Sequence, residues 1–212
     1  RMAWLIESES HERSQKRQAR LIRAAKLKVS SACVEDIDYG PRRGLEKQQL
    51  AGLTQCQWVL QKQHLIITGP TGVGKTWIAC AFGMQAIRRG ITVTYRRVGR
   101  LLEETEIARA DGTLPKLRSQ IAKSQLLILD DWALAPLTVM GRQDLLEFVE
   151  DRTDVGSILL ASQLPIKQWH DYIDEPTLAD AILDRILHRS HKIEMRGGSM
   201  RKKHGIKAEG KS

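Results

Sequence analysis

Several common signals are missing from this chain of 212 residues, and each absence excludes a class of protein. No apolar run approaches the roughly 20 residues of a membrane span, and no apolar signal segment opens the sequence. The three cysteines, Cys33, Cys56 and Cys80, lie far apart without a CxxC pair, which argues against a disulfide framework or a zinc site. These absences predict a protein of the reducing cytoplasm that makes no membrane contact and whose thiols are buried or incidental.

The most informative stretch that is present is a glycine-rich loop between an expected strand and an expected helix. It follows the apolar residues 65–67 and runs Gly69-Pro70-Thr71-Gly72-Val73-Gly74-Lys75-Thr76-Trp77. In a GxxxxGK[ST] loop, glycines allow the backbone N–H groups to converge on phosphate oxygens at a helix N-terminus. We expect these nine residues to bind a nucleoside triphosphate, with Lys75 on the β- and γ-phosphates and the Thr76 hydroxyl on Mg²⁺.

A second expected strand ends in two carboxylates. Four apolar residues, 126–129, precede Asp130 and Asp131, and open α/β sheets bind ligands at the carboxyl ends of their strands. We expect Asp130 to hold Mg²⁺ and Asp131 to accept a proton from the attacking water or to orient it, which favours hydrolysis over mere binding. No DxxG follows the acids and NKxD is absent, so ATP rather than GTP is the expected nucleotide. No HExxH zinc pattern or Ser-His-Asp elbow indicates a competing chemistry.

The remaining pattern predicts the fold class. Strand-like segments at 64–68, 92–98, 126–130, 157–162 and 191–195 alternate with helical segments. This rhythm predicts an α/β fold, a phosphate-loop core whose five-stranded parallel sheet has helices on both faces. We expect a basic helical segment at 1–30 that is the remnant of a larger N-terminal region, a linker with short helices at 31–63, the ATPase core at 64–198, and a basic tail at 199–212.

Several stretches, in this order, resemble one family. They are 35–39 with 43–45, the phosphate loop, 100–104, 129–132, Ser162-Gln163-Leu164-Pro165 with Trp169-His170, 176–185, and 198–202. From about Ile22 to Lys203 the chain resembles the IstB-type helper ATPases of bacterial insertion sequences, relatives of DnaC-type helicase loaders and DnaA-type initiators in the AAA+ class. The phosphate loop is common to many families, whereas stretches 162–165 and 178–185 are more specific.

The resemblance implies an AAA+ core with the ATP site between subunits of a homo-oligomer. Lys75, Thr76, Asp130, Asp131 and Gln163 would come from one protomer, and Arg185 would reach the neighbour's γ-phosphate as an arginine finger. Arg201 would act as a sensor arginine from the tail, because no room remains for a full helical lid domain after residue 195. AAA+ proteins more commonly have Glu where this chain has Asp131, and since the carboxylate then sits about one methylene further back, we expect slow turnover.

The family also implies the partners. Its members work beside a DDE-type transposase, assemble on duplex DNA, bend it and stimulate integration, so we expect an ATP-dependent transposition helper. A DnaC-type helicase loader is the alternative, with a small-molecule kinase and a nucleotide-gated DNA scaffold as further rivals. The sequence leaves open the oligomer size, the DNA sequence preference and the identity of the transposase.

Charge gives a second, weaker indication of DNA. Residues 1–30 hold eight Lys and Arg against three Glu, and residues 191–212 hold seven against two, while the middle is nearly neutral. Basic ends indicate either a polyanionic partner or solvated tails.

The expected DNA contacts, at the position that initiator-type relatives aim at DNA, are Arg96, Arg97, Arg100, Lys116 and Arg118. The alternative for Arg96 and Arg97 is that they are edge-strand charges that discourage aggregation. No aromatic set accompanies them, so phosphate contact is expected rather than base reading.

Overall fold

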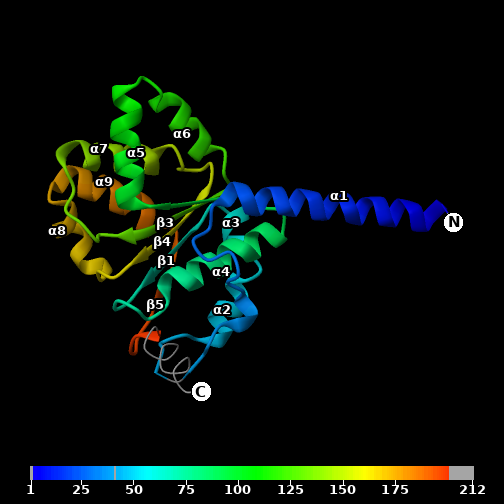
Figure 1. Cartoon of the computed structure of the whole chain (residues 1–212). Coiled ribbons are helices and arrows are strands. Elements are labelled where there is room, and N and C mark those ends of the chain that lie inside the picture. Colours follow the sequence, from blue (N-terminus) through cyan, green and yellow to red (C-terminus); the bar gives the residue numbers. More distant parts are fainter. Residues whose placement is uncertain (1, 41, 201–212) are drawn as a thin grey trace, which may run out of the picture.

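Five parallel strands form one sheet, which confirms the predicted α/β fold (Figure 1). The computed structural model describes residues 2–40 and 42–200, and side chains from residue 12 onward within these ranges. The strands are β1 (His64–Thr68), β2 (Val93–Arg97), β3 (Leu126–Trp132), β4 (Ser157–Ser162) and β5 (Ser190–Glu194), in the spatial order β2-β3-β4-β1-β5. This order places β4 between β1, which leads into the phosphate loop, and β3, which carries the two acids.

Helices cover both faces of the sheet because every central strand is apolar on both sides. On one face, Leu65 and Ile67 pack in a core with α4 (Lys75–Arg88), the end of α1 (Met2–Ala25), α2 (Lys47–Leu53) and α3 (Gln57–Leu60). On the other face, Ile66 packs in a second core with the remaining helices. These are α5 (Val98–Ala110), α6 (Leu114–Ala122), α7 (Val139–Glu150), α8 (Trp169–Ile173) and α9 (Pro176–Leu187). Figure 1 shows the two sets on opposite sides of the strands.

Two of these helices begin at side-chain caps that the sequence encodes. The Thr138 hydroxyl accepts the N–H of Gly141 at the start of α7, and the Glu175 carboxylate accepts the N–H groups of Thr177 and Leu178 at the start of α9. Pro176 occupies the first turn of α9, where a missing N–H costs nothing. The loops before both helices are thereby fixed on the carboxyl side of the sheet.

The first helix differs from the expected span of residues 13–28. It runs from Met2 to Ala25, and it ends there because Lys26 adopts a left-handed φ of 52°. Ala25 is buried and Leu21 and Ile22 are half-buried against the first core, whereas the N-terminal part of α1 extends away from the body of the molecule (Figure 1).

No helix in the described ranges is long and apolar enough to cross a bilayer. Residues 31–63 contribute to the same core as α4, and the four-part division of the chain stays a prediction.

Candidate nucleotide-binding site

The phosphate loop has the backbone that its glycines predict. Gly72 and Gly74 have φ values of 85° and 100°, and Gly69 has 150°. A Cβ at Gly69 would lie 2.4 Å from the carbonyl oxygen of Met195, and one at Gly72 would lie 2.5 Å from the Ser199 hydroxyl. The loop is therefore held closely by residues 195–200, and Met200 donates its N–H to the Gly72 carbonyl at 2.9 Å.

Lys75 begins α4 and turns back along this loop. Its ammonium group donates to the carbonyl oxygens of Gly69 at 2.7 Å and Pro70 at 2.9 Å. Burial lowers the pKa of Lys75, and the nearby carboxylates of Asp130 and Asp131 oppose that shift. A partly desolvated cation beside a glycine-rich loop at a helix N-terminus is suited to bind phosphate oxygens.

Thr76, Asp130 and Tyr95 form a buried hydrogen-bonded group beside the loop. The Thr76 hydroxyl lies 2.8 Å from Oδ2 and 3.1 Å from Oδ1 of Asp130, and the Tyr95 hydroxyl donates to Oδ2 at 2.6 Å. Asp130 is 1% exposed, and burial together with this carboxylate raises the pKa of Tyr95. Paired hydroxyl and carboxylate oxygens are the hard ligands that Mg²⁺ prefers, so these residues fit that ion.

Asp131 follows directly but faces a different neighbour. The pairing of β3 with β4 shifts between Leu129 and Trp132, and Asp131 has a left-handed φ of 58°. Its carboxylate, 34% exposed, lies 3.5 Å from Nε of Arg97 at the end of β2. A non-glycine residue held in this region is strained by about 1–3 kcal/mol. The bulge separates the two acids, so that one is buried beside Thr76 and the other opens toward solvent.

The end of β4 lies between the loop and the acids, as expected for Ser162 and Gln163. The side-chain amide oxygen Oε1 of Gln163, the residue after β4, accepts a hydrogen bond from the Thr71 hydroxyl at 2.5 Å, which joins this segment to the phosphate loop. Ser162 instead donates to the carbonyl of Trp132 at 2.9 Å and holds the end of β3. The Ser162 carbonyl also accepts the N–H of Gly69 at 3.2 Å, so the end of β4 and the residue after it both contact the phosphate loop.

Arg185 does not belong to this edge of the sheet. It lies near the end of α9, donates to the Ala181 carbonyl at 2.8 Å and pairs with Glu150 at 2.9 Å. β5 begins three residues after α9 ends, and its first residue pairs with His64, the first residue of β1. The five residues of β1 span about 16 Å, and they separate Arg185 from the loop of its own chain. Arg201 lies outside the described residues.

Four of the five expected DNA contacts have carboxylate neighbours. Arg96 pairs with Glu104 at 3.3 Å, Arg100 with Glu103 at 2.9 Å, and Arg97 with Asp131. Arg118 pairs with Asp151 at 2.8 Å and also with Glu147, and Lys116 is exposed on α6. Arg97 therefore lies at the nucleotide site, where sequence reasoning did not place it. DNA contact by these residues stays a prediction.

Sequence reasoning also missed Tyr95 and Arg43 at this site. Arg43 donates to the Val73 carbonyl at 2.7 Å and to the Asp38 carbonyl at 2.8 Å, so the segment before the core braces the loop. The available signal for Tyr95 was its alternation with Val93 on the buried side of β2. Its partner became visible only with the register, which places Tyr95 opposite Ile128 and Arg97 opposite Asp130.

Comparisons with known proteins identify the family of this chain. The family model described as IstB-like ATP binding protein matches residues 1–208. The insertion sequence ATP-binding protein y4pL of Sinorhizobium fredii is 44% identical over 198 residues, which cover 93% of this chain and 80% of that protein. The IS1162 ATP-binding protein of Pseudomonas fluorescens is 47% identical over 165 residues, which cover 78% and 71%.

Solved structures support the fold alone, because their identities are low. DnaI matches with a TM-score of 0.66 and 20% identity over 78% of this chain and 92% of its own. AMPPCP-bound DnaA from Aquifex aeolicus matches with a TM-score of 0.65 and 19% identity over 84% of this chain, which spans about half (54%) of that protein. The fold is thus that of the AAA+ initiators and loaders. Because the family model covers nearly the whole sequence, this chain belongs to the IstB-like ATP-binding proteins of insertion sequences.

Proposed function

We propose that this protein is an ATP-hydrolysing transposition helper that forms homo-oligomers on duplex DNA and stimulates a DDE-type transposase in the cytoplasm. One observation supports the shared ATP site above all. Lys75, Asp130 and Asp131 lie at the carboxyl edge of the sheet, whereas Arg185 lies at the opposite edge of the same chain. An ATP site that needs the phosphate loop and acids at the carboxyl ends of the strands, and also Arg185 near their amino ends, is complete only when two subunits meet.

Each residue of the carboxyl edge has a task in hydrolysis. The loop N–H groups and Lys75 bind the phosphates, and Thr76 and Asp130 would hold Mg²⁺, which neutralises phosphate charge when bound. Asp131 accepts the proton of the attacking water, and Arg97 positions its carboxylate. Gln163, fixed by the Thr71 hydroxyl, orients the same water.

The opposite edge supplies the charge that completes the site of the next subunit. Arg185 is one-third exposed and pairs with Glu150, a surface contact that is worth little and exchanges readily. When the Arg185 side chain leaves Glu150 and contacts the γ-phosphate bound by a neighbouring subunit, its positive charge stabilises the transition state of hydrolysis. The contact is head-to-tail, so repeated copies form a ring or a helical filament. Such an assembly can follow a DNA duplex and multiply weak contacts into avidity.

A helicase loader is the second candidate, because DnaI and the DnaC helicase loader share the fold. Either function would use the same ATP site, so the partner decides between them. Pull-down experiments with a DDE-type transposase and with a replicative helicase as alternative partners separate the two functions. Retention of the helicase alone would favour the loader.

Two substitutions test the nucleotide site. Lys75→Ala removes the main cation on the phosphates and should abolish ATP binding, measured with a fluorescent ATP analogue. Asp131→Asn keeps the shape of the side chain but removes the base, so ATP should still bind while hydrolysis falls by about 100-fold or more. Asp154→Asn, at an exposed surface pair with Arg189, is the matched control and should change neither. Hydrolysis by Asp131→Asn at the parental rate would show that Asp131 is not the base.

A further inference from the structure

The exposed side of α1 carries a row of cations that the ATP site does not use. Residues 12–28 hold seven Lys and Arg and one acid, Glu12. Five of the cations share one face of the helix, because their spacing follows i, i+3, i+4, i+7 and i+10. These residues, named here the basic face, are Arg13, Lys16, Arg17, Arg20 and Arg23, and all five are exposed.

The opposite side of the helix fixes the basic face to the ATPase core. Leu21 and Ile22 pack against the first core and Ala25 is buried in it. Leu27, just after the helix, lies 3.0 Å from the point where a Cβ at Gly83 would stand. Gly83 belongs to α4, the helix that begins with Lys75. The basic face is therefore attached to the element that binds the phosphates of ATP.

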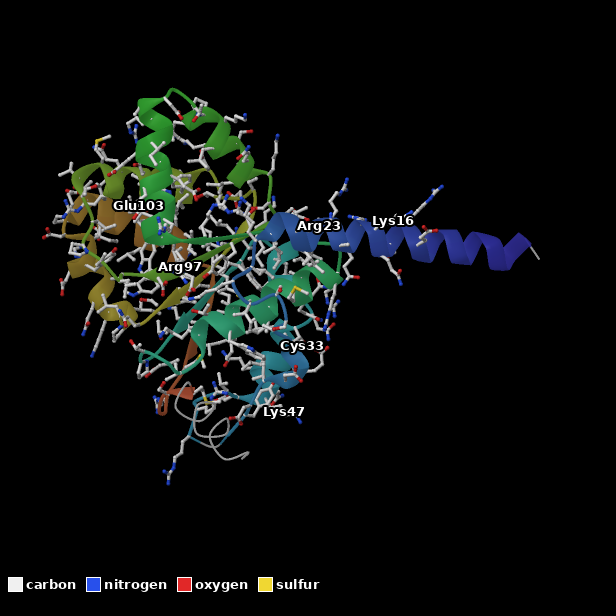
Figure 2. All side chains as sticks on the ribbon, in the orientation of Figure 1. Lys16, Arg23, Cys33, Lys47, Arg97 and Glu103 are labelled. Atoms are coloured by element: carbon white, nitrogen blue, oxygen red, sulfur yellow. The ribbon has the colours of Figure 1, made fainter. Side chains whose placement is uncertain are left out.

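The dimensions of the basic face suit a nucleic acid backbone. Arg13 and Arg23 are ten residues apart, which is about 15 Å along the helix. Figure 2 shows Lys16 on the part of α1 that extends beyond the body and Arg23 closer to it. A rod that projects into solvent can lie along or across a duplex, which carries one negative charge per about 1.7 Å of its axis.

The described contacts of Lys16 and Arg17 neutralise little charge, whereas carboxylates hold two other candidate DNA-binding cations, Arg96 of β2 and Arg118 of α6. The side chains of Lys16 and Glu12 form an i,i+4 pair and are 76% and 63% exposed, so solvent screens them. Arg17 donates a hydrogen bond to the Gly90 carbonyl, a neutral acceptor, at 3.4 Å. By contrast Arg118 is held between two carboxylates, and Arg96 is largely covered beside Glu104.

We propose that the basic face of α1 binds the phosphate backbone of duplex DNA. This inference rests on the DNA binding proposed above and gives it a location. Residues 12–28 contain no aromatic side chain, so the face offers no stacking platform and should bind duplex in preference to single strands. Binding should depend weakly on sequence and strongly on salt, since each phosphate contact adds about 0.9 to the slope of log affinity against log salt.

The test compares two variants that remove the same charge. Lys16→Gln, Arg17→Gln and Arg20→Gln together change the basic face, while Arg100→Gln, Lys116→Gln and Lys123→Gln change α5 and the region of α6. Anisotropy of a labelled 40-base-pair duplex is measured with the full chain and ATP between 50 and 200 mM salt. The basic-face variant should lose about 2.7 from the slope, which means that the parent weakens about 40-fold more than the variant over this range. The other variant should keep most of the parental slope.

The remaining outcomes separate this inference from the proposed function. If the parent binds the duplex and the basic-face variant has an unchanged slope, the location is wrong while DNA binding stands. A larger loss in the α5–α6 variant would move the site to those helices. If the parent does not bind the duplex, both proposals fail. A further outcome is that the parent binds phosphatidylserine vesicles, or a single strand of the same length, as tightly as the duplex or more tightly. If the basic-face variant loses that binding, duplex DNA is not the ligand of this face. Unchanged ATP binding and thermal unfolding in the variant ensure that the folded protein is compared.

Discussion

The Tyr95 hydroxyl should stabilise the folded protein and should also hold the Asp130 carboxylate in the position in which it would bind Mg²⁺. Asp130 is 1% exposed, and a carboxylate removed from water needs hydrogen-bond donors. The structure gives it two, the Thr76 hydroxyl and the Tyr95 hydroxyl, of which the contact with Tyr95 is the shorter at 2.6 Å. Tyr95→Phe removes one donor and leaves the ring in place.

The expected loss follows from these contacts. A buried hydrogen bond to a charged group contributes about 1.5–3 kcal/mol. For a chain of this size that corresponds to a fall of roughly 3–12 °C in the midpoint of thermal unfolding. Tyr95 would also orient the Asp130 carboxylate that would hold Mg²⁺, so the Mg²⁺ concentration for half-maximal ATP hydrolysis should rise about tenfold in the variant.

Urea unfolding and a magnesium titration of ATPase activity measure the two effects. Tyr172→Phe is the matched control, because its hydroxyl donates to the Ala135 carbonyl at 2.9 Å in an exposed position. The control should shift the free energy of unfolding by at most about 0.5 kcal/mol. Equal destabilisation by the two variants, or a magnesium dependence identical to that of the parent, would refute the reasoning about Asp130.

Two further predictions concern the loop and the far edge of the sheet. Gly72→Ala should abolish ATP binding, because the new Cβ would lie 2.5 Å from the Ser199 hydroxyl at a residue with a φ of 85°. Gly52→Ala is the control and should leave ATP binding intact, because a Cβ there meets nothing within 4 Å. Full ATP binding by Gly72→Ala would show that the loop does not need this backbone conformation. Burial lowers the pKa of His64 to about 4 from its ordinary 6.5, so the unfolded chain takes up the proton first and the free energy of unfolding falls as pH drops below 6.5. The loss should reach about 2 kcal/mol by pH 5, and urea unfolding should show it reduced in His64→Asn but not in the exposed His188→Asn; parallel pH profiles in all three would contradict it.

The sequence predicted the parts of this site whose signals are local. The loop at 69–77 and the acids at the end of β3 each lie within a few residues of a strand, so glycine spacing and apolar runs were sufficient to find them. The strands and the covering helices were predicted for the same reason. The family implied the role of Arg185, and the structure adds that this residue lies across the sheet from its own loop.

Contacts between strands could not be predicted in the same way. Tyr95 meets Asp130, and Arg97 meets Asp131, only because β2 lies beside β3 in one particular register. The bulge that turns Asp131 outward depends on the pairing of β3 with β4. The neutralisation of Arg118 depends on α6 packing beside the end of α7. Each of these contacts joins residues between 29 and 35 positions apart, where single-sequence patterns carry no information.

Mixing two inactive variants tests the shared ATP site most directly. Arg185→Ala protomers keep the nucleotide-binding edge and Lys75→Ala protomers keep the arginine, so neither should hydrolyse ATP alone. In a mixture of equal parts, interfaces that join an intact loop to an intact arginine should restore about a quarter of the parental rate. Arg189→Ala, which removes a neighbouring exposed arginine paired with Asp154, is the control and should hydrolyse ATP at the parental rate. No recovery at any ratio, with Arg185→Ala inactive by itself, would contradict an ATP site shared between subunits.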